Sequence, residues 1–344
     1  MRNWPAWIGY VVAAVSAMYA MLGVYWTFGG AGFPVGVGDP EMVDEGAEAI
    51  VGNLLGFAVP EVAGPAIAAL GGLGAVAATL MARGWGNGAA SRALLGFSGA
   101  LAVGLTVVVQ DYRSIIVVAY TPILVVGKTF FGWPAESGFG DLYMWPRLNL
   151  LIWLLIGVAW ALTALAYRRR TTGACANCGS PAASASSSAL TWGRRAVLVA
   201  VVTPLIYCAS RWAWALGFSL GIDAEFYRQG QENGLWILGA MLATLGALGA
   251  VLTLGLVQRW GEVFPRWMIG LRGRRVPPML AVIPASLVAV LVIAAGFMYV
   301  RVAIGHGLTA ETLAMVGPEL LWPIWGAALF VAAMAYHRRR RTSC

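Results

Sequence analysis

Long apolar stretches constrain this chain most strongly. Eight of them lie near residues 7–27, 60–82, 92–110, 146–167, 195–218, 235–256, 277–300 and 318–336. A helix needs about 18 or more apolar residues to cross the hydrocarbon core of a bilayer, and lipid leaves no alternative to bonding backbone groups within the segment. The predicted fold class is therefore all-α, a polytopic membrane helix bundle with eight transmembrane helices. The short alternating strands of a β-barrel are excluded.

Composition supports a membrane protein. The 344 residues are 60% hydrophobic and only 11% charged, with a mean hydropathy of +0.75, whereas charged residues make up about 25% of soluble proteins. The net charge of +8 would suggest nucleic acid on a soluble surface, but here helix orientation accounts for it. We therefore expect the lipid bilayer as partner and no nucleic acid.

The charges predict the orientation of the spans. Most of the 23 basic residues gather at alternate span ends, as expected of cytoplasmic ends: Arg2, Arg83, Arg92, Arg168–Arg170, Arg194, Arg195, Arg259, Arg266, Arg272, Arg274, Arg275 and Arg338–Arg341. Only one acid, Glu262, lies among them, and the other acids fall at the opposite ends. Both termini are therefore predicted to be cytoplasmic.

Residues 114–131, SIIVVAYTPILVVGKTFF, fit this count poorly. Thr121-Pro122 interrupts the run, and a crossing here would place the cluster Arg168–Arg170 outside. We expect a re-entrant or interfacial segment on the outer side, with a short true span as the alternative.

An internal repeat organises the chain. GPAIAALGGLGAVAATLMARGWG, from Gly64, matches GAMLATLGALGAVLTLGLVQRWG, from Gly239, and ALAYRRR at 164–170 matches AMAYHRRRR at 333–341. We predict a first four-helix repeat over 1–170, a cytoplasmic Ser- and Ala-rich linker over 171–194 and a second repeat over 195–344. Four spans is an even number, so the two repeats share one orientation.

Aromatic corners at the ends of the first and fifth spans, YWTFGG and WAWALG, precede glycine- and alanine-rich helices. With QRWGEVFPRWMIGLRGRRVPP, they resemble uncharacterised multi-pass membrane proteins of actinobacteria. The resemblance implies a bacterial plasma membrane, but it names no activity and carries no residue role. Small residues such as Gly71 and Gly246 predict a tight helix seam that joins the two halves, and a substrate path lined by these residues is the alternative.

Arg211 is a charge inside a span, and a guanidinium there costs about 2.5–3.5 kcal/mol unless it snorkels or pairs. The matching residue of the first repeat is Gly23. Snorkelling to the outer headgroups is one explanation; pairing with an acid near a span end is the other, the candidates being Asp111, Glu61, Glu232 and Glu319.

We expect a ligand site on the outer side, with Arg211 at its floor. The guanidinium would pair with Asp111 or Glu61, or hold an anionic group of a small molecule or lipid. Tyr207, Trp214 and Trp26 would form the walls, since Tyr207 and Trp214 are seven residues apart and share a helix face, as do Tyr19 and Trp26. Arg113, Arg147, Asn149, Arg301 and His306 are expected to form a solvated rim.

Cys175 and Cys178 form half of a zinc motif, and without a second pair two free thiols are favoured. The sequence predicts no cofactor, metal or catalytic residue. A transporter-like or lipid-handling protein is favoured, because a duplicated, like-oriented helical unit with one asymmetric charge could enclose a site between its halves. The alternatives are a membrane-embedded enzyme, for which no nucleophile and base converge, and a scaffold without a ligand.

Overall fold

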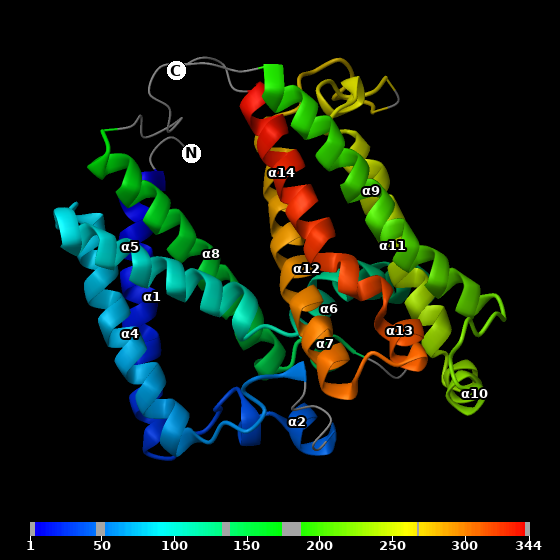
Figure 1. The fold of residues 1–344 in the computed structure, drawn as a ribbon, viewed down its shortest axis with the longest axis horizontal. Helices are drawn as coiled ribbons and strands as arrows, with labels where there is room; N and C mark the ends of the chain where they lie inside the picture. The colour runs from blue at the N-terminus through cyan, green and yellow to red at the C-terminus, as the bar shows by residue number, and fades with distance from the viewer. Residues whose placement is uncertain (1–3, 46–51, 133–137, 174–186, 267, 341–344) are drawn as a thin grey trace. The chain divides into compact units, whose positions relative to one another are not determined.

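The computed structural model describes residues 4–45, 52–132, 138–173, 187–266 and 268–340, which divide into two compact units (Figure 1). Unit 1 holds residues 4–45, 52–114 and 143–173. Unit 2 holds residues 115–132, 138–142, 187–266 and 268–340. Residues 115–132 thus cluster with the second unit, whereas the sequence groups them with the first repeat.

Nine helices in the described ranges are long and apolar enough to cross a membrane: Trp4–Thr27, Pro60–Ala82, Gly88–Val108, Arg113–Phe131, Trp145–Thr171, Thr191–Ala215, Leu235–Leu254, Pro278–His306 and Pro318–Arg340. The only β-structure in these ranges is one isolated bridge, between Val263 and Arg275. The all-helical fold is thus confirmed, and its long apolar helices are consistent with a membrane helix bundle. Eight of the nine coincide with the expected spans, and the ninth is the segment that we expected not to cross.

Unit 1 is built from four long helices, α1 (Trp4–Thr27), α4 (Pro60–Ala82), α5 (Gly88–Val103) and α8 (Trp145–Thr171). A π-helical turn, η2 (Gly104–Val108), continues α5, and the short η1 (Gly36–Gly38) and α2 (Pro40–Glu45) lie between α1 and α4. Pro60 and Pro146 stand in the first turns of α4 and α8, where the N–H that proline lacks is not needed.

Glycines let α1 and α4 approach closely. A Cβ on Gly23 would lie 2.5 Å from the Ala68 nitrogen, and one on Gly71 would lie 2.7 Å from the Ala20 nitrogen. These distances leave no room for a side chain, so the backbones themselves are in contact. The small residues therefore pack two helices of the same unit together, whereas the sequence led us to expect a seam between the two halves.

Unit 2 has four long helices that run side by side in Figure 1, α9 (Ser187–Ala215), α11 (Leu235–Leu254), α12 (Pro278–His306) and α14 (Trp322–Arg340). Shorter elements connect them: α10 (Ala224–Glu232), η4 (Arg259–Gly261), α13 (Ala310–Val316) and η5 (Pro318–Leu321). The core holds Ala200, Val282, Ala289, Leu329 and Tyr336 at one level, and Tyr207, Cys208, Ala243, Val292 and Trp322 at another.

The segment expected to be broken forms α6 (Arg113–Val126), followed by the π-helical turn η3 (Gly127–Phe131) and the short α7 (Phe139–Leu142). The expectation of an interruption at Thr121-Pro122 is wrong, because Pro122 lies inside the helix and the Thr121 hydroxyl bonds to the Val117 carbonyl. In Figure 1, α6 runs across the direction of α12.

The basic ends of the two units contain matching contacts. Tyr167 on α8 donates to the Trp85 carbonyl at 2.8 Å, and Tyr336 on α14 donates to the Gly261 carbonyl at 2.6 Å. Arg170 binds the Ala82 carbonyl at the end of α4, and Arg339 binds the Leu256 carbonyl just beyond α11. Arginines therefore satisfy carbonyls that helix ends leave free.

Candidate functional site

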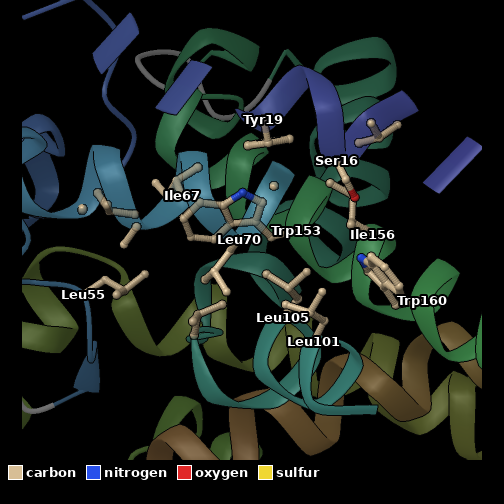
Figure 2. Close-up of a pocket in the computed structure, with 16 residues that line it drawn as sticks. Ser16, Tyr19, Leu55, Ile67, Leu70, Leu101, Leu105, Trp153, Ile156 and Trp160 are labelled. Atoms are coloured by element: carbon tan, nitrogen blue, oxygen red, sulfur yellow. The ribbon is translucent and has the colours of Figure 1, made fainter. Parts of the chain in front are cut away.

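Unit 1 encloses an apolar cavity of about 250 Å³ between its four long helices (Figure 2). The lining comes from α1, α4, α5 with η2, and α8, and from the loop residues Val35 and Leu55; it includes Ser16, Tyr19, Ile67, Leu70, Leu101, Leu105, Val109, Trp153, Ile156 and Trp160. Ligand pockets in proteins are typically apolar with a few placed polar groups. This composition suits an apolar ligand or part of one.

The cavity has a closed side and an open side. Tyr19 and Trp153, with ring centroids 6.3 Å apart, are buried in its wall. Ala66 and Leu70 on α4 also line it, yet both are exposed, Leu70 to 48%. The cavity therefore opens sideways through the outer face of α4.

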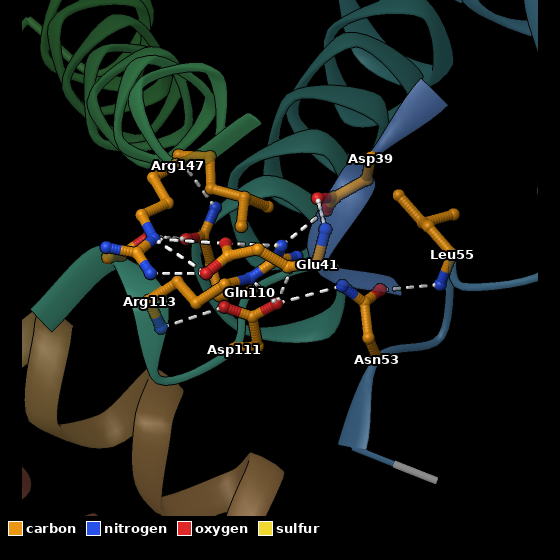
Figure 3. Close-up of polar contacts among 10 residues, drawn as sticks. Asp39, Glu41, Asn53, Leu55, Gln110, Asp111, Arg113 and Arg147 are labelled. Atoms are coloured by element: carbon orange, nitrogen blue, oxygen red, sulfur yellow. Dashed lines mark hydrogen bonds and ion pairs between the residues drawn. The ribbon is translucent and has the colours of Figure 1, made fainter. Parts of the chain in front are cut away.

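A buried cluster of charges lies at the end of unit 1 where α8 begins (Figure 3). Arg113, only 1% exposed, pairs with the buried carboxylates of Asp39 and Asp111 and lies 3.3 Å from Glu41. Glu41 also accepts hydrogen bonds from Arg147. Each of the three carboxylates thus pairs with one of two guanidiniums, as buried charges require, and the cluster carries one net negative charge.

The charged cluster holds the loops that close the cavity. The Asn53 amide donates to Asp111 at 2.8 Å, and the Asn53 side-chain oxygen accepts from the backbone N–H of Leu55. The Leu55 side chain lines the cavity. Gln110 donates to the Leu105 and Leu150 carbonyls at 2.8 and 3.0 Å. The positions of Leu55 and Leu105 in the cavity wall thus depend on polar side chains behind them.

Electrostatics at Glu41 favour its ionised form. Burial raises the pKa of the Glu41 carboxyl, but the hydrogen bonds and positive charges of Arg147 and Arg113 outweigh burial and lower the pKa overall. Glu41 is therefore ionised at neutral pH.

Unit 2 contains the expected arginine in a buried setting. The Arg211 side chain is 12% exposed and forms an ion pair with Glu319 in η5, which is 3% exposed. Its guanidinium carbon lies 4.0 Å from the centroid of the Trp214 ring and 4.8 Å from that of Tyr207. One of its nitrogens also donates to the Met315 carbonyl at 3.2 Å. Arg211 therefore pairs with an acid of its own unit.

Arg211, Glu319, Tyr207, Trp214 and Trp322, here called the Arg211 cluster, include buried polar atoms without partners in the described part of the chain. Arg211 Nη1, Glu319 Oε2, Trp214 Nε1 and Trp322 Nε1 are buried and have no hydrogen-bond partner among the described residues. Tyr207 connects the two ends of this set, because its ring packs against Trp322 with centroids 5.4 Å apart. Buried unpaired donors and acceptors are rare in native proteins and indicate an unseen partner such as water or a ligand.

The structure brings together only part of the predicted site. Tyr207 and Trp214 flank Arg211 as expected, but the partner acid is Glu319 and not Asp111 or Glu61. Asp111 belongs to unit 1, where Arg113 and Asn53 occupy its oxygens. Glu61, in the first turn of α4, is exposed. Trp26 is buried in unit 1 against Phe33.

The predicted solvated rim is wrong for two of its members. Arg113 is 1% exposed and Asn149 is fully buried, where its oxygen accepts from the Tyr19 hydroxyl at 2.8 Å. In sequence, an arginine at the end of a span looks the same whether it is buried or solvated. The one feature that could have indicated buried pairing of Arg113 was the acid-rich stretch that contains Asp39 and Glu41.

Metal binding finds no support in the part of the chain that the structure describes, which contains no group of three or more His, Cys, Asp or Glu side chains suited to a metal ion. Cys175 and Cys178 lie outside the described residues.

Comparisons of the chain with protein-family models, with curated proteins and with solved structures found no match.

Proposed function

We propose that this chain is a lipid-handling, transporter-like membrane protein that binds an apolar lipid chain in unit 1. The observation that carries the proposal is the cavity of about 250 Å³, whose lining is apolar and whose side opening passes Ala66 and Leu70. A lipid chain could enter from the bilayer through such an opening without crossing water. The cavity favours ligand binding over a purely structural role.

Photocrosslinking tests this proposal. A fatty acid with a diazirine near its chain end is incorporated into vesicles with the purified protein, and crosslinked residues are mapped by mass spectrometry. We expect crosslinks at Leu70, Ile67 and Trp153. Ala66→Trp, which blocks the opening, should reduce them at least about fivefold, a loss of about 1 kcal/mol of binding.

Ala69→Trp is the matched control, since Ala69 is also exposed on α4 but does not line the cavity. Crosslinks spread evenly over all exposed apolar side chains, or unchanged in Ala66→Trp, would refute chain binding in the cavity.

We also propose that the two units derive from like-oriented four-helix repeats, α1-α4-α5-α8 and α9-α11-α12-α14. The matching hydrogen bonds of Tyr167 and Tyr336 support this proposal. The ring pairs Tyr19–Trp153 and Tyr207–Trp322 support it as well, because they join corresponding helices.

The proposed topology has eight crossings, cytoplasmic termini and α6 along the outer side of a bacterial plasma membrane. The direction of α6 in Figure 1 supports this assignment. Cysteines placed near Asp44, Glu136 and Glu225 should react with an impermeant reagent from outside, and those near Thr171 and Arg272 should not. External labelling at Thr171 would overturn the topology.

The Arg211 cluster is a second candidate site, favoured by its unpaired buried atoms. If a ligand or water accepts from Trp214 Nε1, Trp214→Phe should destabilise the protein about as much as Trp236→Phe, which loses a 2.9 Å hydrogen bond to the Tyr227 carbonyl. If nothing binds there, Trp214→Phe should cost less, because an unpaired buried donor is removed.

A further inference from the structure

The connection between α11 and α12 is a folded hairpin at the basic end of unit 2. Val263 and Arg275 form its β-bridge, and the Phe264 and Val276 nitrogens donate across it to the Arg274 and Glu262 carbonyls at 3.0 and 2.9 Å. Gly270 and Gly273 turn the tip with φ of +85° and +72°. This network gives the connection a defined shape.

The hairpin is anchored to α14. Arg340 donates to the Val276 carbonyl at 3.0 Å, and Arg339 forms an ion pair of 3.1 Å with Glu262. Since Glu262 is the one acid of the hairpin, its negative charge is already neutralised from α14.

The hairpin's own positive charges remain unneutralised. Its arginines are exposed, and none forms an ion pair with any other described residue: Arg259, Arg266, Arg272, Arg274 and Arg275. Orientation of the spans explains basic residues near helix ends, but it does not require them to be displayed on a folded hairpin. In unit 1 the connection between α4 and α5 is only residues 83–87.

An apolar tip accompanies these charges. At the tip, Ile269 is 99% exposed and Leu271 is 38% exposed, and Val263 in the β-bridge is 41% exposed. Both helices that flank the hairpin are candidate spans, so the hairpin is held beside the membrane surface. Exposed apolar side chains among basic residues are typical of segments that enter the headgroup layer.

We infer that this hairpin binds anionic phospholipid headgroups of the adjacent leaflet, with its arginines on the phosphates and Ile269 inserted at the level of the acyl chains. Guanidinium groups bind phosphate oxygens in a bidentate manner, and juxtamembrane basic clusters bind anionic lipid. This inference does not depend on the cavity of unit 1.

Lipid titration of the full-length protein in neutral detergent tests the charges. Native mass spectrometry counts bound phosphatidylglycerol, with phosphatidylcholine as the reference. We expect the parent protein to prefer phosphatidylglycerol, and Arg272→Gln/Arg274→Gln/Arg275→Gln to weaken its binding at least about tenfold, since each surface arginine contributes about fivefold. Arg83→Gln/Arg92→Gln, with Arg83 in the short connection of unit 1 and Arg92 near the start of α5, should leave the preference unchanged.

A probe at Ile269 tests insertion. The four native cysteines are replaced by serine, Ile269→Cys is labelled with an environment-sensitive fluorophore, and the protein is placed in vesicles with or without phosphatidylglycerol. A blue shift that grows with phosphatidylglycerol supports the inference. A water-like emission in both vesicles would overturn it, as would an unchanged lipid preference in the triple variant, or displacement of phosphatidylglycerol by equimolar inorganic phosphate or RNA.

Discussion

Gly23 in unit 1 and Arg211 in unit 2 occupy matching positions of the two proposed repeats, four residues after Tyr19 and Tyr207. In unit 1 a Cβ on Gly23 would lie 2.5 Å from the Ala68 nitrogen, so α1 and α4 touch through their backbones. In unit 2 the Arg211 side chain lies along Gly239, with its Cδ at 3.7 Å from a Cβ built there. One architecture thus admits either a glycine contact or a charged side chain between the same two helices.

The interiors of the units differ as well. Tyr19 and Trp153 border the cavity of unit 1, whereas the corresponding pair Tyr207 and Trp322 belongs to a packed cluster with Val292 and Ala295. Ile115 of α6 packs against that cluster. The difference teaches that the two proposed repeats keep the aromatic pair while different side chains surround it.

Replacement of Arg113, the buried arginine of unit 1, should reduce stability more than replacement of Arg211 in unit 2. Arg113→Leu leaves Asp39 and Asp111 buried without a counter-charge, and breaking a buried pair costs about 3–5 kcal/mol. We expect the variant to unfold at much lower temperature in detergent than the parent protein, or not to fold. Arg113→Leu/Asp111→Leu should not recover stability, since Asp39 remains unpaired; full recovery would contradict the cluster.

Arg211→Leu should destabilise unit 2 by less, about 2–4 kcal/mol, because only Glu319 is left unpaired. Unlike the unit 1 cluster, this pair is simple enough to be replaced entirely. Arg211→Leu/Glu319→Leu should regain most of the lost stability, measured by thermal unfolding. If Arg211→Leu instead inserts as well as the parent and is as stable, Arg211 snorkels. Unit 2 would then have no buried ion pair to compare with the charged cluster of unit 1.

Gly64 and Gly239, at matching positions of α4 and α11, offer a matched pair of substitutions. Gly64→Ala should cost about 1–3 kcal/mol, since its Cβ would lie 2.6 Å from Thr27 Oγ1 and 2.9 Å from the Gly23 oxygen. Gly239→Ala, at the matching position, meets only Arg211 Cδ at 3.7 Å and should be close to neutral. Equal losses in thermal stability would show that the two helix pairs are packed alike.

Acid should weaken unit 1 more than the exposed ion pairs of unit 2. The lowered pKa of Glu41 means that its contribution is fully present above its ordinary value of 4.5 and is lost as the pH falls through the lower folded value. The loss should be about 1 kcal/mol or less and should shrink in Arg147→Gln. Glu225 has a pKa lowered by hydrogen bonds from Arg228 and Gln229, but both partners of this pair are well exposed to solvent, so Arg228→Gln should leave the thermal-unfolding profile against pH unchanged.

The helices could be predicted because apolar length is a local property. α4 begins and ends at residues 60 and 82, as expected from its apolar stretch. Residues 114–131 were harder, because their roughly 13 apolar residues before Lys128 fall short of the roughly 18 that a span needs, and a proline inside a helix resembles an interruption.

The site depended on contacts that sequence does not display. Arg211 could be identified as unusual from its place in a span, but Glu319 is 108 residues away and was one of four candidates. Arg113 lies 74 residues from Asp39, and nothing local distinguishes it from a solvated arginine. The cavity is a space left by side chains of four helices, so no single motif predicts it.

The distance along the chain between Arg211 and Glu319 has a consequence for synthesis. Translation at about 5–20 residues per second separates the emergence of these residues by roughly 5–20 s. During that interval α9 has been made but its counter-charge does not yet exist. The ion pair that neutralises Arg211 can therefore form only after η5 has been made, so the final packing of α9 waits for the last helix of unit 2.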